Sequence, residues 1–203
     1  GGQAAGRKPG DELQVQKLGH IYTPAYVLAF VLFKNSSEAD DALGVTATLT
    51  ALDADGKSLG SGQQSLSRLR PQESMALGAP IQVPENAKVD RVTADLTATG
   101  WERDEHPDWR MTTKDVRYEQ AQGIPGGLGI SLGNVRGTLD SSYLQPLSNV
   151  GVLGVCYDGG GEVDGGGVSS VPSVPAKASV SVSIPAFASG QPASCQMFAH
   201  TTT

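Results

Sequence analysis

The sequence repeats itself at an offset of 105 residues, and this repetition constrains the fold more than any local motif does. Residues 35–98 lie over residues 140–203 without a gap, so the turn residues of one half fall on those of the other. A repeat of this length predicts two similar modules of about ninety residues each. The matching positions include Val45 on Val150, Asp53 on Asp158, Gly56 on Gly161, Ser74 on Ser179 and Pro80 on Pro185.

Each half consists of short alternating segments separated by Gly, Pro, Asp and Asn turn signals, and none keeps a helical apolar period for three turns. Such spacing is typical of immunoglobulin-like sandwiches, so we predict an all-β fold of two tandem immunoglobulin-like β-sandwich domains. Residues 1–10 are predicted to form a flexible tether, residues 11–105 the first sandwich and residues 106–203 the second. The predicted strands are Leu13–Leu18, Tyr26–Lys34, Val45–Leu52, Ser58–Leu66, Ser74–Ala79 and Asp90–Thr99, then one from about Asp115, Gly129–Leu139, Val150–Tyr157, Gly166–Val171, Ala178–Ile184 and Ser194–Thr201.

Turn and strand motifs in the two halves resemble a known family. Each half has N-S-S or D-S-S, an alternating strand ending in A-L-D or C-Y-D, a glycine turn, and L-R-P-Q-E-S or V-P-A-K-A-S. This order resembles the FxLYD-type immunoglobulin-like repeats of bacterial envelope proteins over nearly the whole chain. Tyr157 and Asp158 match that motif, Gly154 and Cys156 replace its aromatic residue and leucine, and the first half keeps only Asp53. The resemblance implies an extracytoplasmic lipoprotein with no shared enzymatic activity.

Charged residues are scarce and mainly acidic, with 21 Asp and Glu, 15 Lys and Arg, and a formal net charge of −6. Nucleic-acid affinity depends on clustered Lys and Arg, and the sequence has no such cluster, so we expect no nucleic-acid partner. The longest apolar run, Ala25–Phe33, is too short for a spanning helix and predicts a buried strand. Because the chain starts at Gly1 rather than Met, we expect membrane contact only through a removed or absent N-terminal anchor.

The two cysteines, Cys156 and Cys195, are expected to form a disulfide. Cys156 lies near the end of one predicted strand and Cys195 near the start of the last, and such strands can be antiparallel neighbours in an immunoglobulin-like sheet. Their counterparts in the first half are Ala51 and Asp90, so the bond would belong to the second module alone. A disulfide implies an oxidising compartment, so we expect a secreted or membrane-anchored extracytoplasmic protein.

The glycine-rich segment Gly154–Gly167 raises the choice between an anion-binding loop and a turn. It lies over the hairpin signal Asp53–Lys57, and no helix-forming sequence follows it, although a phosphate loop requires a helix N-terminus. We therefore interpret it as a turn. A calcium site would have only the carboxylates of Asp53 and Asp55, because Gly62 occupies the position of the closing bidentate ligand.

Ser131 lies in a G-x-S-x-G pattern, in which it would be a nucleophile with His200 as its base. That motif needs a strand, a sharp turn and a helix, whereas the repeat places Ser131 inside a strand, so a hydrolase is disfavoured. We predict no catalytic, cofactor-binding or metal-binding residues. A copper site is also not expected, because the histidines and methionines are dispersed along the chain: His20, His106, His200, Met75, Met111 and Met197.

The segment Trp101–Tyr118 holds both tryptophans and the densest charge, and it lies where one repeat passes into the next. Residues 104–108 predict a polar turn. In one interpretation, Trp101 and Trp109 pair across a hairpin or pack at the junction and hold the modules at a fixed angle. In the other they stay exposed as contacts for a partner. We favour packing, because most tryptophans are largely buried.

Three functions of different classes remain open. The favoured one is a non-enzymatic envelope binding or adaptor protein that presents surfaces to a protein or cell-wall partner. The second is a small-ligand or metal-binding envelope protein, which a concave pocket lined by convergent polar groups would favour. The third is a hydrolase that uses Ser131.

Overall fold

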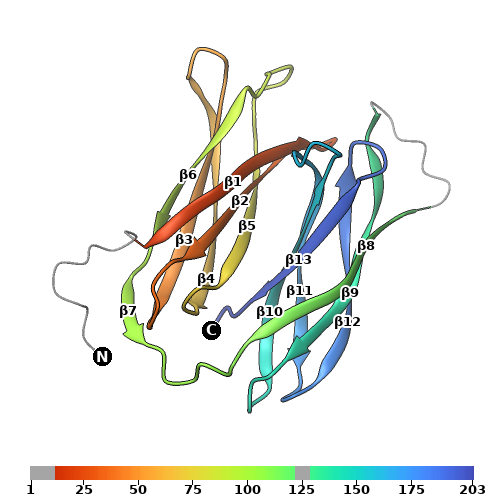
Figure 1. The fold of residues 1–203 in the computed structure, drawn as a ribbon. Helices are drawn as coiled ribbons and strands as arrows, with labels where there is room; N and C mark the ends of the chain where they lie inside the picture. Colours follow the sequence, from red (N-terminus) through yellow and green to blue (C-terminus); the bar gives the residue numbers. More distant parts are fainter. Residues whose placement is uncertain (1–11, 122–128) are drawn as a thin grey trace.

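The computed structural model describes residues 12–121 and 129–203, and in this part of the chain it is all β (Figure 1). The predicted tether falls on residues 1–10, which lie outside the described part. No helix in the two described ranges is long and apolar enough to span a bilayer. The strands are β1 (Leu13–Tyr22), β2 (Val27–Asn35), β3 (Asp40–Leu52), β4 (Ser58–Leu69), β5 (Ser74–Ile81), β6 (Arg91–Thr97), β7 (Gly100–Arg103), β8 (Met111–Gln120), β9 (Ser131–Ser141), β10 (Leu147–Tyr157), β11 (Val163–Val174), β12 (Ser179–Ala188) and β13 (Ser194–His200).

The first half of the chain forms two facing antiparallel sheets. One has the order β1-β2-β5, and the other has the order β4-β3-β6, with β7 also paired to β3. Alternate residues of these strands point between the sheets, as the period-two pattern predicts. The core that they form includes Phe33, Leu49, Leu77 and Trp101.

The second half forms a single six-stranded antiparallel sheet, with the order β13-β10-β11-β12-β9-β8. The sheet curls until its two edge strands meet, and the Thr113 hydroxyl on β8 donates to the Met197 carbonyl on β13 at 2.9 Å. Val135, Leu139, Val152 and Ile184 lie inside this nearly closed barrel. The all-β prediction is confirmed, but this half is not the separate pair of sheets that a sandwich requires, so the structure is not clearly two immunoglobulin-like sandwiches.

The 105-residue offset is visible in the strand bounds and in one turn. β4 spans residues 58–69 and β11 spans residues 163–174, which are the same positions after the offset. In the turn before β4, the Asp53 carboxylate accepts the amides of residues 55 and 57, and Gly56 has a φ of 82°. In the turn before β11, the Asp158 carboxylate accepts the amides of residues 160 and 162, and Gly161 has a φ of 84°. Residues 158–162 of the glycine-rich segment are therefore a hairpin turn, as predicted, and the rest of the segment belongs to β10 and β11.

The two halves differ at the pairing that closes the barrel. β11 pairs with β12 through two register positions, Gly165 with Ala188 and Gly166 with Phe187. The corresponding strands of the first half, β4 and β5, belong to separate sheets. The two β11–β12 residue pairs thus join the second half into one curled sheet, whereas the first half, without such pairs, keeps two separate sheets.

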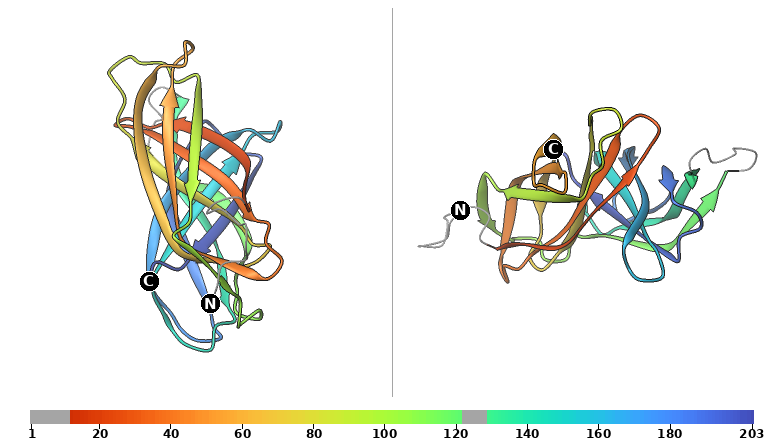
Figure 2. Two further views of the ribbon diagram at one scale, coloured as in Figure 1. Left: turned by 90° about the vertical axis from the view of Figure 1, so that its left-hand side faces the viewer. Right: turned by 90° about the horizontal axis from the view of Figure 1, so that it is seen from above.

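Strand β2 is buried on both of its faces. Phe33 and its alternates point into the first core, whereas Leu28, Phe30 and Leu32 point the other way and contact Leu153 and Val155 of β10 in a third apolar cluster. In the view from above, the β1–β2 hairpin lies between the rest of the first half and the second half (Figure 2). The continuous apolar run correctly predicted a buried strand. The first half buries one face of β2, and β10 of the second half buries the other.

Close approach of the halves depends on glycine at two positions. A Cβ on Gly19 of β1 would lie 2.6 Å from the Cβ of Val163 on β11. A Cβ on Gly166 would lie 2.6 Å from the Phe30 ring. The halves therefore contact each other through closely fitted apolar surfaces, and such packing favours a fixed arrangement.

Candidate binding site at the junction of the two halves

The segment between β7 and β8 crosses from the first half to the second as a turn. The Asp104 carboxylate accepts the His106 amide at 3.0 Å, and the Trp109 amide donates to the His106 carbonyl at 3.0 Å. The Asp104 amide donates to the Ala39 carbonyl at 2.9 Å, which ties the segment to the start of β3. The predicted polar turn is present, and it brings Trp109 to the boundary between the halves.

Two carboxylates and an arginine form a buried ion network beneath this turn. Arg70, at the end of β4, lies 3.4 Å from the Asp41 carboxylate and 2.9 Å from the Asp104 carboxylate. All three side chains are at most 5% exposed. The more exposed Arg68 and Arg110 complete the network, at 2.6 Å from Asp41 and 3.6 Å from Asp104. Charges this well buried persist only when paired, so the network fixes the turn against β3 and β4.

The network leaves polar atoms unsatisfied. Burial raises the pKa of Asp41, although a hydrogen bond from Arg68 and the charge of Arg70 oppose that shift. Within the described residues, Asp41 Oδ1 and Arg70 Nε have no hydrogen-bond partner. Buried polar atoms without a partner are uncommon in native proteins, so these two atoms are positions where a water molecule or a polar ligand group would be stabilised.

Glu73 lies beside the same network, at the start of β5. Its carboxylate accepts the backbone amide of Arg70 at 3.0 Å. Burial raises the pKa of Glu73 to about 7, against the opposing effects of that hydrogen bond and of Arg110 and Arg70. Glu73 thus titrates near neutral pH at the boundary between the halves.

An aromatic stack holds Trp109 in place over Arg70. The His106 ring lies parallel to the Trp109 ring at 3.8 Å between centroids, and the Tyr143 ring is tilted against it at 5.4 Å. The Arg70 guanidinium lies 5.9 Å from the Trp109 ring and 5.4 Å from the Tyr143 ring, and its Nη2 donates to the Tyr143 hydroxyl at 3.3 Å. Tyr143 belongs to the β9–β10 loop, so the stack joins the two halves and Trp109 remains partly exposed.

Trp101 has a different position from Trp109. It lies on β7, is 4% exposed and packs in the first core. Trp101 is therefore packed in the core of the first half, whereas Trp109 packs in the aromatic stack at the junction. Of the two candidate partner contacts, Trp109 is the one with accessible surface.

A cleft of about 280 Å³ opens beside this stack. It is lined by residues of the strands β3, β4, β7 and β10, the crossing turn, the β9–β10 loop and the segment after β13. The side chains that give it its chemistry are Arg68, Arg70, Glu102, His106, Trp109 and Tyr143. Aromatic faces next to cationic and acidic groups can bind a ligand or protein side chain of mixed polarity.

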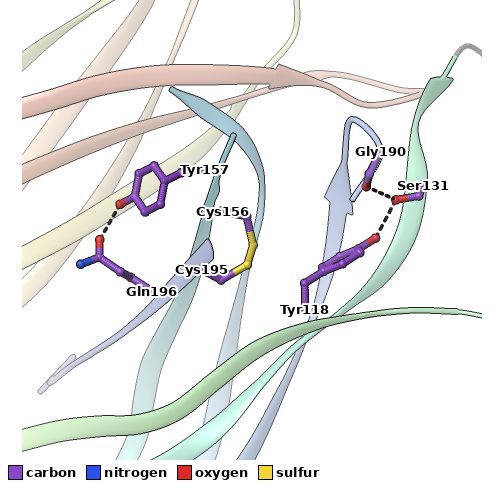
Figure 3. Close-up of a disulfide and its surroundings, with 7 residues drawn as sticks. All are labelled: Tyr118, Ser131, Cys156, Tyr157, Gly190, Cys195 and Gln196. Carbon is purple, nitrogen blue, oxygen red and sulfur yellow. Dashed lines mark hydrogen bonds between the residues drawn. A yellow bond between two sulfur atoms is a disulfide. The ribbon is translucent and has the colours of Figure 1, made fainter. Parts of the chain in front are cut away.

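The structure does not bring Ser131 and His200 into hydrogen-bond contact. Ser131 opens strand β9, and its hydroxyl lies 2.8 Å from the Tyr118 hydroxyl and donates to the Gly190 carbonyl at 3.3 Å (Figure 3). His200, 3% exposed, lies over Gly151 with Nδ1 3.4 Å from the Thr201 carbonyl. Ser131 therefore has neither the strand–turn–helix setting nor the base that a nucleophile elbow requires.

Cys156 and Cys195 form the predicted disulfide between β10 and β13 (Figure 3). The two residues lie directly opposite each other in the antiparallel register, with their Cα atoms 4.0 Å apart. Next to the bond, the Tyr157 hydroxyl donates to Gln196 Oε1 at 2.6 Å. A disulfide of this kind fits an oxidising, extracytoplasmic compartment.

The candidate metal ligands do not assemble in the described part of the chain. No group of three or more His, Cys, Asp or Glu side chains there is placed to hold a metal ion. Asp53 is committed to its own turn through the amides of residues 55 and 57. Met75 packs in the first core, whereas Met111 and Met197 pack in or against the second.

No protein-family model matches the chain, and no curated protein matches it. One similar solved structure is a beta-glucuronidase from glycoside hydrolase family 2, at 12% identity and a TM-score of 0.30, covering 84% of this chain and 20% of that one. Another is red sea bream transglutaminase, at 13% identity and a TM-score of 0.28, covering 94% of this chain and 29% of that one. The chain thus spans less than a third of either protein. At TM-scores this low the similarity carries no argument about activity, and the resemblance to FxLYD-type repeats stays a prediction.

Sequence reasoning missed the ion network, although the repeat contains a signal for it. Arg70 corresponds to Pro175 after the 105-residue offset, and Asp41 corresponds to Pro146. The first half therefore places buried charges where the second half has prolines. Positions at which two repeats differ in this way indicate contacts that belong to one copy alone.

Proposed function

We propose that the chain is a non-enzymatic extracytoplasmic binding or adaptor protein that presents the junction cleft to a protein or cell-wall partner. The observation that carries the proposal is the placement of Trp109, which is partly exposed and held by His106, Tyr143 and Arg70 over a buried ion network. Trp, Tyr and Arg contribute most to binding energy at interfaces, and a preordered side chain loses little entropy on binding.

The tandem arrangement supports this proposal in a second way. The apolar contact of Phe30 and Leu153 and the bond from the Ser67 amide to the Thr201 carbonyl, at 2.9 Å, hold the two halves against each other. A cleft between parts that keep a fixed arrangement keeps its shape, as specific recognition requires. The finer proposal is that the two halves are diverged immunoglobulin-like, FxLYD-type repeats and that the protein is attached to its membrane as a lipoprotein.

Site-specific photocrosslinking tests the proposal. A photoreactive amino acid at position 105, on the rim of the cleft, should form a discrete adduct in native envelope extract. The same amino acid at position 55, in the exposed turn between β3 and β4, is the matched control and should form none. Trp109→Ala should abolish the adduct at position 105 while the circular dichroism spectrum stays unchanged.

Equal labelling from positions 105 and 55, or an adduct that survives Trp109→Ala, would refute the junction as the partner surface.

A second candidate function is small-ligand binding in the cleft, which the convergence of Arg68, Arg70 and Glu102 on one concave surface favours. In that case the adduct would be absent, and a small molecule from the extract would raise the melting temperature of the wild type but not of Trp109→Ala.

A further inference from the structure

A second polar hollow lies on the outer face of the barrel, away from the junction. Arg117 of β8 and Arg136 of β9 are directly opposite each other in the strand register. Like charges at opposite positions repel and destabilise a sheet. The repulsion between the two guanidinium charges must therefore be offset by acidic groups of the protein or by an anionic ligand that contacts both arginines.

Acidic groups of the protein neutralise the charges of these two arginines only in part. One carboxylate serves both arginines: Glu119 lies 3.0 Å from Nε of Arg117 and 2.7 Å from Nε of Arg136. Arg117 Nη1 also donates to the Asp115 carbonyl at 3.1 Å. Within the described residues, Arg117 Nη2 and both Nη atoms of Arg136 make no hydrogen bond to the protein. Two cations against one anion leave one net positive charge and several free donors.

A break in strand β8 lies next to a hollow beside these donors. The β8–β9 register shifts between Lys114 and Arg117, and Asp115 inside the shift has a φ of 55°. Such bulges turn side chains toward new directions and occur frequently beside binding sites. The hollow has a volume of about 230 Å³ and is lined by Arg117, Arg136, Gly137, Thr138, Ser181, Val182 and Ser183.

Hydroxyl groups continue the donor surface across the sheet. In the register of β9 and β12, Arg136 pairs with Ser183 and Thr138 pairs with Ser181. These four side chains share the outward face, because the alternate residues of both strands point into the barrel core. The Ser183 hydroxyl donates to Asn134 Oδ1 at 3.3 Å, so the donor set consists of the guanidinium groups and the hydroxyls of Thr138 and Ser181. Guanidinium groups and hydroxyls on one face of a hollow suit a planar or tetrahedral oxyanion.

We propose that this hollow binds a single oxyanionic group, a carboxylate, sulfate or phosphate carried by a ligand of the protein. The site has two arginines and an overall excess of one positive charge on a chain of net charge −6, so it fits one anionic group and not a polyanion such as nucleic acid. The proposal is independent of the junction cleft, which shares no residue with this hollow.

The test is a nuclear magnetic resonance titration of the whole chain with inorganic phosphate, sulfate and acetate, each at constant ionic strength with sodium chloride as reference. We expect saturable shifts of the arginine Nε–H signals and of the amides of residues 136, 138, 181 and 183. Saturation by phosphate or sulfate alone identifies a tetrahedral ligand, and saturation by acetate alone identifies a carboxylate. Shifts that are linear in concentration and equal for chloride would overturn the proposal.

Three variants make the test specific. Arg136→Gln should weaken binding about tenfold, the factor expected from the loss of charge-assisted hydrogen bonds. Arg91→Gln removes a similarly exposed arginine, paired with Asp90, from the first half and should leave binding unchanged. Glu119→Gln should tighten binding, because it removes the carboxylate that competes for both Nε donors. Unchanged binding in Arg136→Gln, or weaker binding in Glu119→Gln, would overturn the proposal.

Discussion

Removing the Cys156–Cys195 disulfide should cost about 4 kcal/mol in the free energy of unfolding, the value that chain entropy gives for a closed loop of 39 residues. For a chain of 203 residues, this corresponds to a fall in melting temperature of roughly 8–16 °C. The perturbation is the double variant Cys156→Ala and Cys195→Ala, measured by calorimetry and by urea unfolding. Reduction of the wild type should reproduce its effect to within about 1 kcal/mol, the size of a small core void.

Because the disulfide ties the edge strand β13 to β10, its loss should also increase local opening of β13. Among the described strands, β13 pairs only with β10, and on the other side of β13 the Thr113 hydroxyl donates to the Met197 carbonyl. Amide hydrogen exchange in residues 194–200 should therefore accelerate more than exchange in β9 or β12 when the bond is absent. The double variant treated with reductant is the control and should not change further. A loss below about 1 kcal/mol, or two reactive thiols in the unfolded, unreduced wild type, would refute the reasoning.

Four further predictions follow from the junction and the cores. Phe30→Ala should destabilise the protein by about 3–5 kcal/mol in urea unfolding, because the fully buried ring joins the halves. Gly19→Ala should cost about 1–3 kcal/mol, because its methyl group would overlap a side chain of β11. The pKa of Glu73 is raised from 4.5 to about 7, so between these pH values the folded form holds a proton that the unfolded form releases. Stability should therefore fall as pH rises from 4.5 to 7, and Glu73→Gln should reduce that slope. Iodide should quench Trp109 and leave the blue-shifted emission of the buried Trp101 unaffected; quenching of both would contradict the assignment of Trp101 to the core.

The hairpin turns and the disulfide could be predicted, because each depends on a few residues that are recognisable in the sequence. The turn of Asp53 and its copy at Asp158 could be predicted, because Asp and Gly at fixed spacing determine the backbone there. The disulfide could be predicted because it needs only two cysteines at the ends of neighbouring strands. The residues that form the turn are matched between the halves by the offset, whereas Cys156 and Cys195 have no cysteine counterpart in the first half.

The closure of the barrel and the ion network could not be predicted in this way. Closure depends on the pairing of Gly165 and Gly166 with β12, and glycine in a strand carries no side-chain pattern that specifies a partner. The network joins Asp41, Arg70 and Asp104 from distant positions, and each of them read alone is a polar residue near a turn. Such contacts depend on tertiary packing, which a period-two pattern does not encode.

The two-sided burial of β2 has an evolutionary consequence. An apolar strand face that is covered by another part of the chain becomes exposed when that part is removed, and large exposed apolar patches promote association. Leu28, Phe30 and Leu32 face Leu153 and Val155 of the second half, so removing either half would leave an exposed apolar patch on the other. We therefore expect homologous chains to carry both halves or neither.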